Sequence, residues 1–277
     1  MAKDSKIEWT HHTFNPWWGC AKVSPACTHC YAEAWAKRVG STVWGKDAPR
    51  RFFGDAHWND PVRWHREAAL QGVRRRVFCA SMADVFERRA ELHQWRERLW
   101  RLIEATPSLD WLLLTKRPHN VRSMVPWGAS WPENVWLGCT AENQIWADKR
   151  VPALLEAPAN VRFLSCEPLL GPLDLSRYLS SDPAQSIHWV IAGGESGAHS
   201  RPMNPEWVRG LRNECQRANA AFHFKQWGHW VPEELLTEQQ RNVIVLDGHR
   251  LAAVGKGKAG RSLDGRTWDE LPFKRHA

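Results

Sequence analysis

The sequence predicts an α/β fold in the form of a complete or partial (β/α) barrel. Three observations support this class: short apolar runs recur along the chain, segments with helical periodicity separate them, and each run turns abruptly polar at its end. Apolar residues on consecutive positions indicate strands that are covered on both faces. Strands that alternate with helices are typical of a parallel sheet. An open doubly wound sheet is the alternative.

The expected elements follow one another without an internal repeat. We expect strands at residues 77–81, 111–115, 135–139, 161–165, 188–192 and 222–224. We expect helices at residues 30–39, 60–71, 86–104, 142–157 and 205–219. Six or seven such units are more than most open sheets need, which favours the barrel. Functional groups should then cluster at the carboxyl ends of the strands, where the following loops converge.

The end of the chain differs from the alternating part. Residues 242–246 and 250–254 are apolar runs joined by Asp247-Gly248, which predicts a hairpin with a tight turn. The Lys/Gly-rich run at 255–261 predicts a short cationic loop. We therefore expect a barrel over residues 1–231 and a C-terminal extension, packed on that barrel, over residues 232–277.

Composition limits the classes of protein to which the chain can belong. No apolar run approaches the ~18 residues of a membrane span, and the charged N-terminus lacks the pattern of a secretory signal. Seven cysteines, an odd number, argue against a disulfide framework and favour reduced thiols in the cytosol. Lys and Arg exceed Asp and Glu by 38 to 30, which favours a polyanionic partner over merely scattered surface charge.

Three cysteines stand close together in the sequence, at Cys20, Cys27 and Cys30, with the spacing C-x6-C-x2-C. Three thiolates can hold three irons of a [4Fe-4S] cluster and leave the fourth iron open to a ligand. Structural zinc is the alternative, and it needs four closed ligands. The fourth would be a nearby histidine, namely His11, His12 or His29. Because the other four cysteines are isolated in the sequence, the iron–sulfur interpretation is favoured.

The cysteine loop resembles that of radical S-adenosylmethionine enzymes related to spore photoproduct lyase. The matching residues are Asn15-Pro16-x-x-Gly19-Cys20 and Cys27-x-x-Cys30-Tyr31-Ala32. The loop resembles more closely a phage and bacterial family, the phage-protein family with a three-cysteine motif, in which the six-residue spacing also occurs. Further blocks similar to that family lie at 78–86, 114–118, 193–197 and 224–228.

This resemblance implies a barrel of the radical S-adenosylmethionine type with a [4Fe-4S] cluster on Cys20, Cys27 and Cys30. In such enzymes one electron from the cluster opens S-adenosylmethionine, and the resulting 5′-deoxyadenosyl radical abstracts hydrogen from a substrate. The resemblance further implies a cytoplasmic enzyme with an electron donor such as flavodoxin or ferredoxin and no membrane partner. Together with the net basicity, it favours an anionic substrate such as a nucleic acid base in DNA or RNA, or a nucleotide.

Polar residues at the expected strand ends are candidates for binding S-adenosylmethionine. Ser81 and Asp84 stand at the end of the strand expected at 77–81, counted as the second strand of such a barrel, where this superfamily places contacts to the methionyl group. Glu142 is a plausible ribose partner. Gly194 and Glu195 are similar in composition to the GGE element that meets the methionyl amine. They follow about the sixth strand rather than the second, so a plain glycine-assisted turn is an equal alternative.

Other charged residues at these ends are candidates for contacts with a substrate. Glu167 is expected to form an ion pair with Lys116 or Arg117, or to contact the cofactor or substrate. Lys116, Arg117 and Lys225 are cations that suit an anionic group, although surface solvation is the alternative for each. The run Arg74-Arg75-Arg76 before a strand is either a phosphate contact or a solvated stretch of charge.

No residue identifies the atom that is attacked, so the catalytic residues stay unknown. A second hypothesis is a zinc- or cluster-stabilised nucleic-acid-binding protein without catalysis. A barrel that keeps the cysteine loop but has lost S-adenosylmethionine binding is a third.

Overall fold

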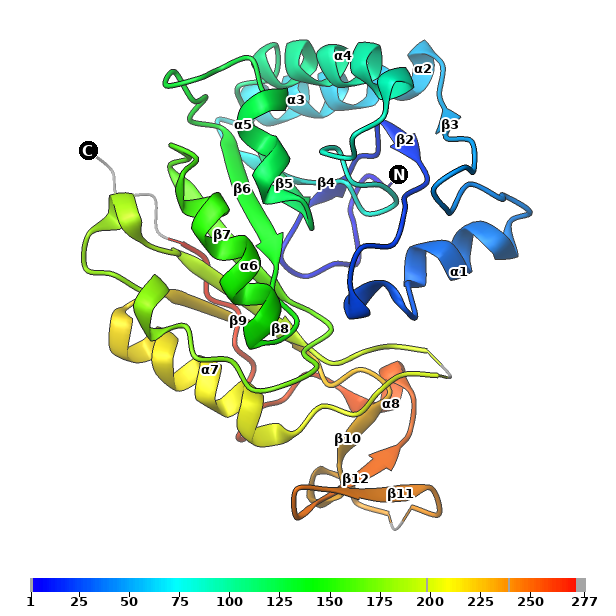
Figure 1. Cartoon of the computed structure of the whole chain (residues 1–277), viewed down its shortest axis with the longest axis vertical. Coiled ribbons are helices and arrows are strands. Elements are labelled where there is room, and N and C mark those ends of the chain that lie inside the picture. Colours follow the sequence, from blue (N-terminus) through cyan, green and yellow to red (C-terminus); the bar gives the residue numbers. More distant parts are fainter. Residues whose placement is uncertain (1, 198, 239, 273–277) are drawn as a thin grey trace. The chain divides into compact units, whose positions relative to one another are not determined.

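A computed structural model describes residues 2–197, 199–238 and 240–272 of the chain. Its main feature is a seven-stranded sheet in the order β1-β4-β5-β6-β7-β8-β9 (Figure 1). The strands are β1 (His12–Thr13), β4 (Arg75–Cys79), β5 (Leu109–Thr115), β6 (Val135–Thr140), β7 (Val161–Cys166), β8 (Trp189–Gly193) and β9 (Ala221–Gln226). The sheet is parallel and open, with β1 and β9 at its edges. The predicted α/β class is therefore confirmed, in the form of a partial barrel.

The strands form where the sequence carries consecutive apolar residues. All six residues of β6 and of β7 are buried, as expected for strands that are covered on both faces. The six expected strands are all present, within two residues of their predicted starts and ends. β1 has only two residues, too few to show a periodic pattern, and its residues alone do not predict it.

The expected helices are present, with one that begins later than predicted. The α-helices are α1 (Tyr31–Arg38), α2 (Asp55–Trp58), α3 (Asp60–Leu70), α4 (His93–Glu104), α5 (Val121–Met124), α6 (Gln144–Leu155), α7 (Pro205–Ala218) and α8 (Lys256–Ala259). The helix predicted from residue 86 begins at His93, because Arg96 donates hydrogen bonds to the carbonyls of Val85 and Glu87 and so holds this segment as a turn. α8 replaces part of the predicted cationic loop.

Within the described residues, no helix has the length and apolar character that crossing a membrane requires.

The chain divides into two compact units. The first comprises Met1–Ser24, Ala32–Cys139 and Pro152–Arg162, and the second comprises Pro25–Tyr31, Thr140–Val151 and Phe163–Ala277. In the first unit, α3 packs against β4 and β5, and the antiparallel strands β2 (Trp17–Trp18) and β3 (Arg51–Phe52) pair beside the cysteine loop. The predicted boundary between residues 231 and 232 is a different division and stays a prediction.

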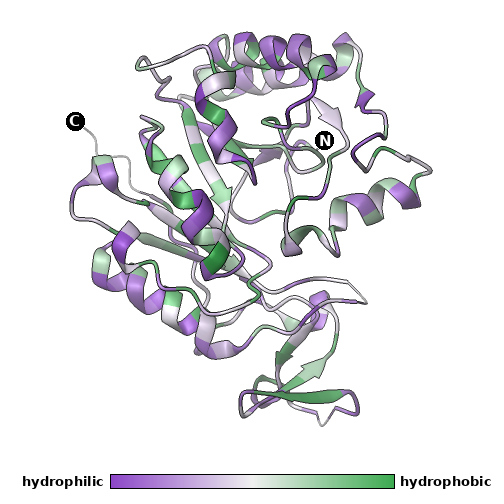
Figure 2. Ribbon diagram, viewed as in Figure 1, coloured by the Kyte–Doolittle hydropathy of each residue, from purple (hydrophilic) through white to green (hydrophobic). Residues whose placement is uncertain are grey.

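In the second unit, α7 packs against β8 and β9 with its apolar side, and hydrophilic residues follow its other side (Figure 2). A small antiparallel sheet of β10 (Trp230–Pro232), β12 (His249–Ala253) and β11 (Val243–Leu246) forms the C-terminal extension. Leu246 pairs with His249, and Asp247 and Gly248 between them have φ values of 48° and 85°. This is the two-residue hairpin turn that Asp-Gly favours, so the predicted hairpin is confirmed.

Candidate metal and cofactor site

In the first unit, Cys20 follows a glycine whose position excludes any side chain. Gly19 has φ +115°, and a Cβ atom there would lie 2.3 Å from the carbonyl oxygen of Val43. The Gly19 N–H donates to the carbonyl of Met82 at 3.0 Å, and the Cys20 carbonyl accepts from the Gly45 N–H at 3.0 Å. The glycine of the motif therefore allows the loop to pass close to the segment around Val43 and fixes the direction of Cys20.

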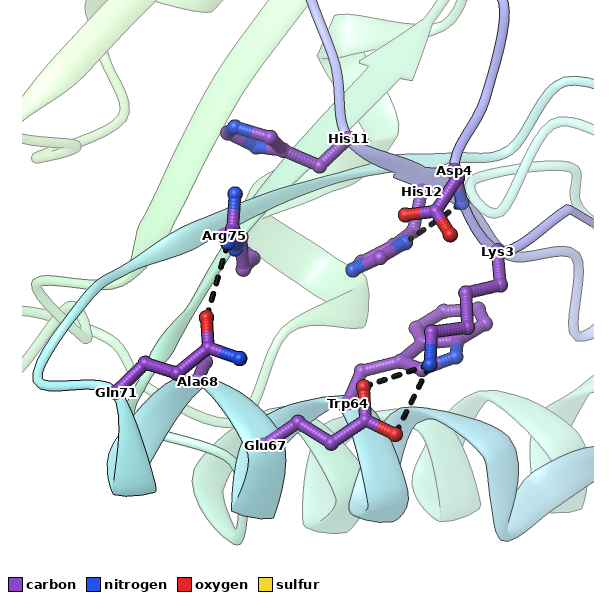
Figure 3. A pocket seen from close by; sticks show the side chains of 9 residues that line it. All are labelled: Lys3, Asp4, His11, His12, Trp64, Glu67, Ala68, Gln71 and Arg75. Carbon is purple, nitrogen blue, oxygen red and sulfur yellow. Dashed lines mark hydrogen bonds and ion pairs between the residues drawn. The ribbon is translucent and has the colours of Figure 1, made fainter.

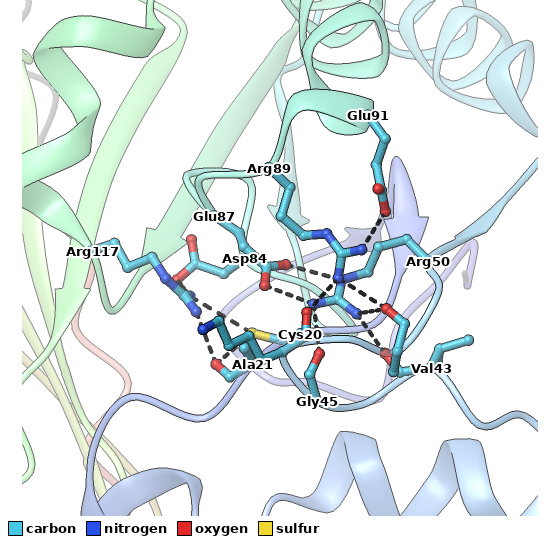
Figure 4. Close-up of polar contacts among 12 residues, drawn as sticks. Cys20, Ala21, Val43, Gly45, Arg50, Asp84, Glu87, Arg89, Glu91 and Arg117 are labelled. Carbon is cyan, nitrogen blue, oxygen red and sulfur yellow. Dashed lines mark hydrogen bonds and ion pairs between the residues drawn. The ribbon is translucent and has the colours of Figure 1, made fainter.

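A buried ion pair holds the segment that faces Cys20. The Arg50 guanidinium donates to both carboxylate oxygens of Glu87, at 3.0 and 2.7 Å, and to the carbonyls of Val43, Ala48 and Gly45 (Figure 4). A bidentate pair of this kind fixes position as well as charge. The sequence did not suggest this role, because Arg50 and Glu87 belong to no motif and are 37 residues apart.

Asp84 and Arg117 form a second buried pair, which touches the cysteine. Arg117 Nη1 lies 2.7 Å from Asp84 Oδ2 and 3.7 Å from the Cys20 sulfur, and Nη2 donates to the Ala21 carbonyl at 2.8 Å. The Asp84 carboxylate also accepts from the Thr115 hydroxyl and from the backbone of Lys116. In this structure Asp84 and Arg117 therefore support the loop that carries Cys20.

The electrostatics around Cys20 follow from this arrangement. Burial, and then the Asp84 carboxylate, raise the pKa of the Cys20 thiol to about 12, although Arg117 acts in the opposite direction. Burial lowers the pKa of Arg117, but Asp84 and Cys20 outweigh it and raise that pKa overall. The Arg117 guanidinium thus stays charged. Its hydrogen bond to the Cys20 sulfur places a positive charge beside that sulfur.

Ser81 lies beside the first residue of the motif. The Asn15 amide nitrogen donates to the Ser81 hydroxyl at 3.1 Å, and Asn15 Oδ1 accepts from the Met82 N–H at 2.7 Å. Asn15 is fully buried. The asparagine of the motif therefore joins the cysteine loop to the end of β4, where Ser81 lies.

In the second unit, Glu142 holds the segment that precedes Cys27. Its Oε1 accepts from the Ala26 N–H at 3.3 Å, and its Oε2 lies 2.6 Å from Arg150 Nη1. Glu142 is fully buried and the Arg150 side chain is 3% exposed. The guanidinium also lies over the Trp146 ring, 4.3 Å from its centroid. A carboxylate enclosed in this way positions a backbone segment rather than facing a solvent-filled cleft.

Glu195 contacts the segment Pro25–Tyr31 in two ways, directly through His29 and indirectly through Arg201. Glu195 Oε2 lies 3.1 Å from His29 Nδ1 and accepts from the Arg201 N–H at 2.7 Å and Nε at 2.9 Å. Arg201 Nη2 donates in turn to the Pro25 carbonyl at 3.0 Å. Burial raises the pKa of Glu195, but the hydrogen bonds from Arg201 and His29 outweigh it and lower that pKa overall.

Glu167 pairs with Lys225, at 2.9 Å, and with neither of the cations that were expected as its partners. The Gln226 amide also reaches Glu167, at 3.3 Å, so these side chains at the ends of β7 and β9 are in contact. Gly194 lies beside them, and a Cβ there would be 1.9 Å from the Trp227 carbonyl oxygen. The glycine is thus required by the close approach of two backbones, as its turn interpretation predicts.

The structure places the predicted residues in two groups. The first unit brings together Cys20, Ser81, Asp84, Lys116 and Arg117, and the second unit holds Cys27, Cys30, Glu142, Glu167, Gly194, Glu195 and Lys225. No disulfide joins any of the seven cysteines. Among the described residues, no three side chains of His, Cys, Asp or Glu are gathered so as to hold a metal ion.

Residues 4–272 match the family described as "Protein of unknown function (DUF5131)". The chain belongs to this family. No curated protein matches it.

Three solved structures are similar to the chain. A cysteine-to-serine variant of spore photoproduct lyase is 13% identical, with a TM-score of 0.51 over 80% of this chain and 78% of that one. Spore photoproduct lyase complexed with dinucleoside spore photoproduct is also 13% identical, with a TM-score of 0.50 over 92% of this chain and 72% of that one. A further variant of that enzyme, with bound AdoMet and dinucleoside spore photoproduct, aligns at a TM-score of 0.49. At this identity the likeness shows the fold, which is the partial barrel of that enzyme.

Proposed function

We propose that this protein is a radical S-adenosylmethionine enzyme with a [4Fe-4S] cluster on Cys20, Cys27 and Cys30. The observation that carries the proposal is the C-x6-C-x2-C motif in a chain with the fold of spore photoproduct lyase. The donor chemistry fits, because none of the three cysteines is in a disulfide and thiolates are the usual ligands of such clusters. When bound, the cluster supplies the electron that opens S-adenosylmethionine to a 5′-deoxyadenosyl radical.

The role of the chain's own residues is to hold the ligands and to receive the cofactor. Ser81, Asp84, Glu142, Glu167, Gly194 and Glu195 remain the proposed S-adenosylmethionine site. Their contacts support a division of this work. Asp84, Glu142 and Glu195 are enclosed and hydrogen-bonded to the segments that carry the cysteines or to residues that hold them, so they act by positioning. Ser81 and Glu167 are less enclosed and are the better candidates for direct contact.

The proposed substrate is a nucleic acid base, a nucleotide or a related anionic molecule. Two observations support this class: the net charge of +8, and the fold shared with an enzyme solved in complex with a dinucleoside photoproduct. Lys116, Arg117 and Lys225 are the proposed substrate cations. Arg117 and Lys225 are already paired with carboxylates, whereas the Lys116 ammonium has no ion-pair partner among the described residues. Lys116 is therefore the first of the three to test. We also propose a reduced flavodoxin or ferredoxin as electron donor and a cytoplasmic location, which suits seven cysteines without a disulfide.

Anaerobic reconstitution tests the cofactor proposal. The protein should bind about four irons per chain and form 5′-deoxyadenosine from S-adenosylmethionine once a reductant is added. Cys27→Ala should abolish iron loading, whereas Cys215→Ala, which removes a buried thiol outside the motif, should retain it. Full iron content in Cys27→Ala would contradict the ligand assignment.

One observation favours the second candidate, a zinc-stabilised nucleic-acid-binding protein. His29 lies between two of the cysteines in the sequence, and its Nδ1 is 3.1 Å from the Glu195 carboxylate. Metal-bound histidines commonly form such a hydrogen bond through the ring nitrogen that does not bind the metal. Three cysteines and His29 Nε2 would make a closed zinc site. The variant His29→Ala separates the two: it should leave iron loading intact in the enzyme but remove the metal from a zinc site. Stoichiometric zinc that depends on His29, without 5′-deoxyadenosine, would establish the second function.

A further inference from the structure

A pocket of about 220 Å³ opens in the first unit (Figure 3). It lies beside His12 and Arg75, the first residues of β1 and β4. Asp84 and Arg117, in contrast, follow the last residues of β4 and β5. The pocket is therefore at the amino ends of the strands and shares no residue with the proposed cluster site.

His12 lines the pocket and presents a hydrogen-bond donor to it. The side chain is buried and stacked on Trp64, with ring centroids 4.5 Å apart. Its Nδ1 accepts a hydrogen bond from the Asp4 N–H at 3.2 Å. Burial lowers the pKa of His12, so the ring is neutral and its single proton must be on Nε2. No described residue accepts a hydrogen bond from that Nε2.

His11 is fixed in the same tautomer. Its Nδ1 accepts from the Arg76 N–H at 2.8 Å, and burial together with Arg76 and Arg75 lowers the pKa of His11 to about 4. This neutral ring also carries its proton on Nε2. Because both Nδ1 lone pairs are engaged and both Nε2 atoms carry protons, the two imidazoles are arranged to meet an acceptor oxygen and not a metal ion.

Two charges at the pocket have no ion-pair partner in the described part of the chain. The Arg75 guanidinium donates to the Gln71 amide oxygen at 3.1 Å but meets no carboxylate, and the Asp4 carboxylate meets no cation. The other two charges at the pocket, Lys3 and Glu67, neutralise one another at 2.8 Å. In Figure 3, Arg75 and Asp4 lie on either side of His12. The pocket thus offers one free positive and one free negative group around two N–H donors.

We propose that this pocket binds a small zwitterion of the α-amino acid type. The carboxylate of the ligand accepts from His12 Nε2 and pairs with Arg75, and its ammonium group faces Asp4. A ligand with a single charge would be attracted by one of these two groups and repelled by the other. The pocket holds several times the ~30 Å³ that one water molecule occupies in the liquid, which leaves room for a molecule of this size.

Histidine-detected NMR titration of the full chain tests this site. Glycine serves as the zwitterionic probe, with acetate, methylammonium and inorganic phosphate as singly functional probes. Glycine should shift the ring nitrogen signals of His12 while leaving its Nε2–H tautomer unchanged. Arg75→Gln and Asp4→Asn should each weaken glycine binding about tenfold or more, and Asp4→Asn should also strengthen acetate binding. The control is Arg66→Gln, which neutralises an exposed arginine on α3, the helix that carries Trp64 and Glu67 of the pocket. This variant should bind glycine as the wild type does.

Several outcomes would overturn the proposal. It is wrong if glycine leaves the His12 signals unchanged in a protein whose unfolding midpoint shows that it is folded. It is also wrong if acetate or phosphate binds more tightly than glycine, or if Asp4→Asn leaves glycine affinity unaltered. Each of these results is independent of iron loading, so failure here leaves the proposed enzyme function untouched.

Discussion

At the residue scale, Gly19 and Asn15 fix the path of the loop that carries Cys20. Gly19 and Asn15 belong to a recognisable string, and their contacts explain why a glycine and an amide stand there. Arg50, Arg150 and Arg201 complete the candidate site but belong to no string. Their partners are brought close only by the folded chain, so a single sequence could not identify them.

Gly19→Ala should destabilise the protein through its backbone. The left-handed conformation alone costs about 1–3 kcal/mol for a residue with a Cβ atom, and the Val43 carbonyl must also move away. Urea unfolding measures the loss. Gly72→Ala is the matched control, because Gly72 has φ +64° but open space around it. Equal losses in the two variants would show that the contact with Val43 contributes nothing.

Arg150→Met should be more disruptive than its single replaced charge suggests. Glu142 would be left buried without its ion-pair partner, and loss of one member of such a pair typically costs about 3–5 kcal/mol. The double variant Arg150→Met, Glu142→Gln should recover part of that loss. Arg177→Met, which breaks an exposed pair with Asp148, should change the free energy of unfolding little. A similar effect of Arg150→Met and Arg177→Met would contradict the buried role of Arg150.

At the element scale, the strands can be predicted more accurately than the start of α4 or the side-chain pairs between strands. Runs such as 135–139 are apolar throughout because both faces are covered, and this signal is local. The start of α4 was misplaced because it depends on Arg96 reaching back to carbonyls that precede the helix. The partner of Glu167 was also missed, since Lys225 stands 58 residues away on β9 and no spacing rule links them.

The segment Pro25–Tyr31 should lose stabilisation in acid. The pKa of Glu195 lies below its ordinary value of 4.5, although burial acts to raise it, because Arg201 and His29 donate hydrogen bonds to the ionised form. A lowered pKa in the folded protein means stabilisation that is present above the ordinary value and is lost as pH falls through the lowered one. The difference in unfolding free energy between wild type and Arg201→Gln should therefore be largest near neutral pH and shrink below pH ~4. Arg122→Gln, an exposed control on α5 that forms no ion pair among the described residues, should show no such trend. A constant difference across this range would exclude Glu195 as the titrating partner.

At the scale of the whole molecule, composition predicted a class of partner but no location for it. The excess of 38 basic over 30 acidic residues is a property of the entire chain. If the substrate is a polynucleotide, its affinity should fall steeply with salt, by a logarithmic slope of about 0.7 per neutralised phosphate of a single strand. Fluorescence anisotropy of a labelled oligonucleotide at several salt concentrations measures this slope. Binding that is insensitive to salt would indicate that the positive charge is not used for phosphate recognition.

The order of the seven-stranded sheet bears on how the chain can be built. Every strand after β4 adds next to the one that precedes it in the sheet, and the first pairing, His12 with Val77, involves only the early part of the chain. A nascent chain leaving the ribosome can therefore extend this sheet in the order of translation, by growth at a single edge. No hydrogen bond between strands that are already paired has to open before the next strand docks.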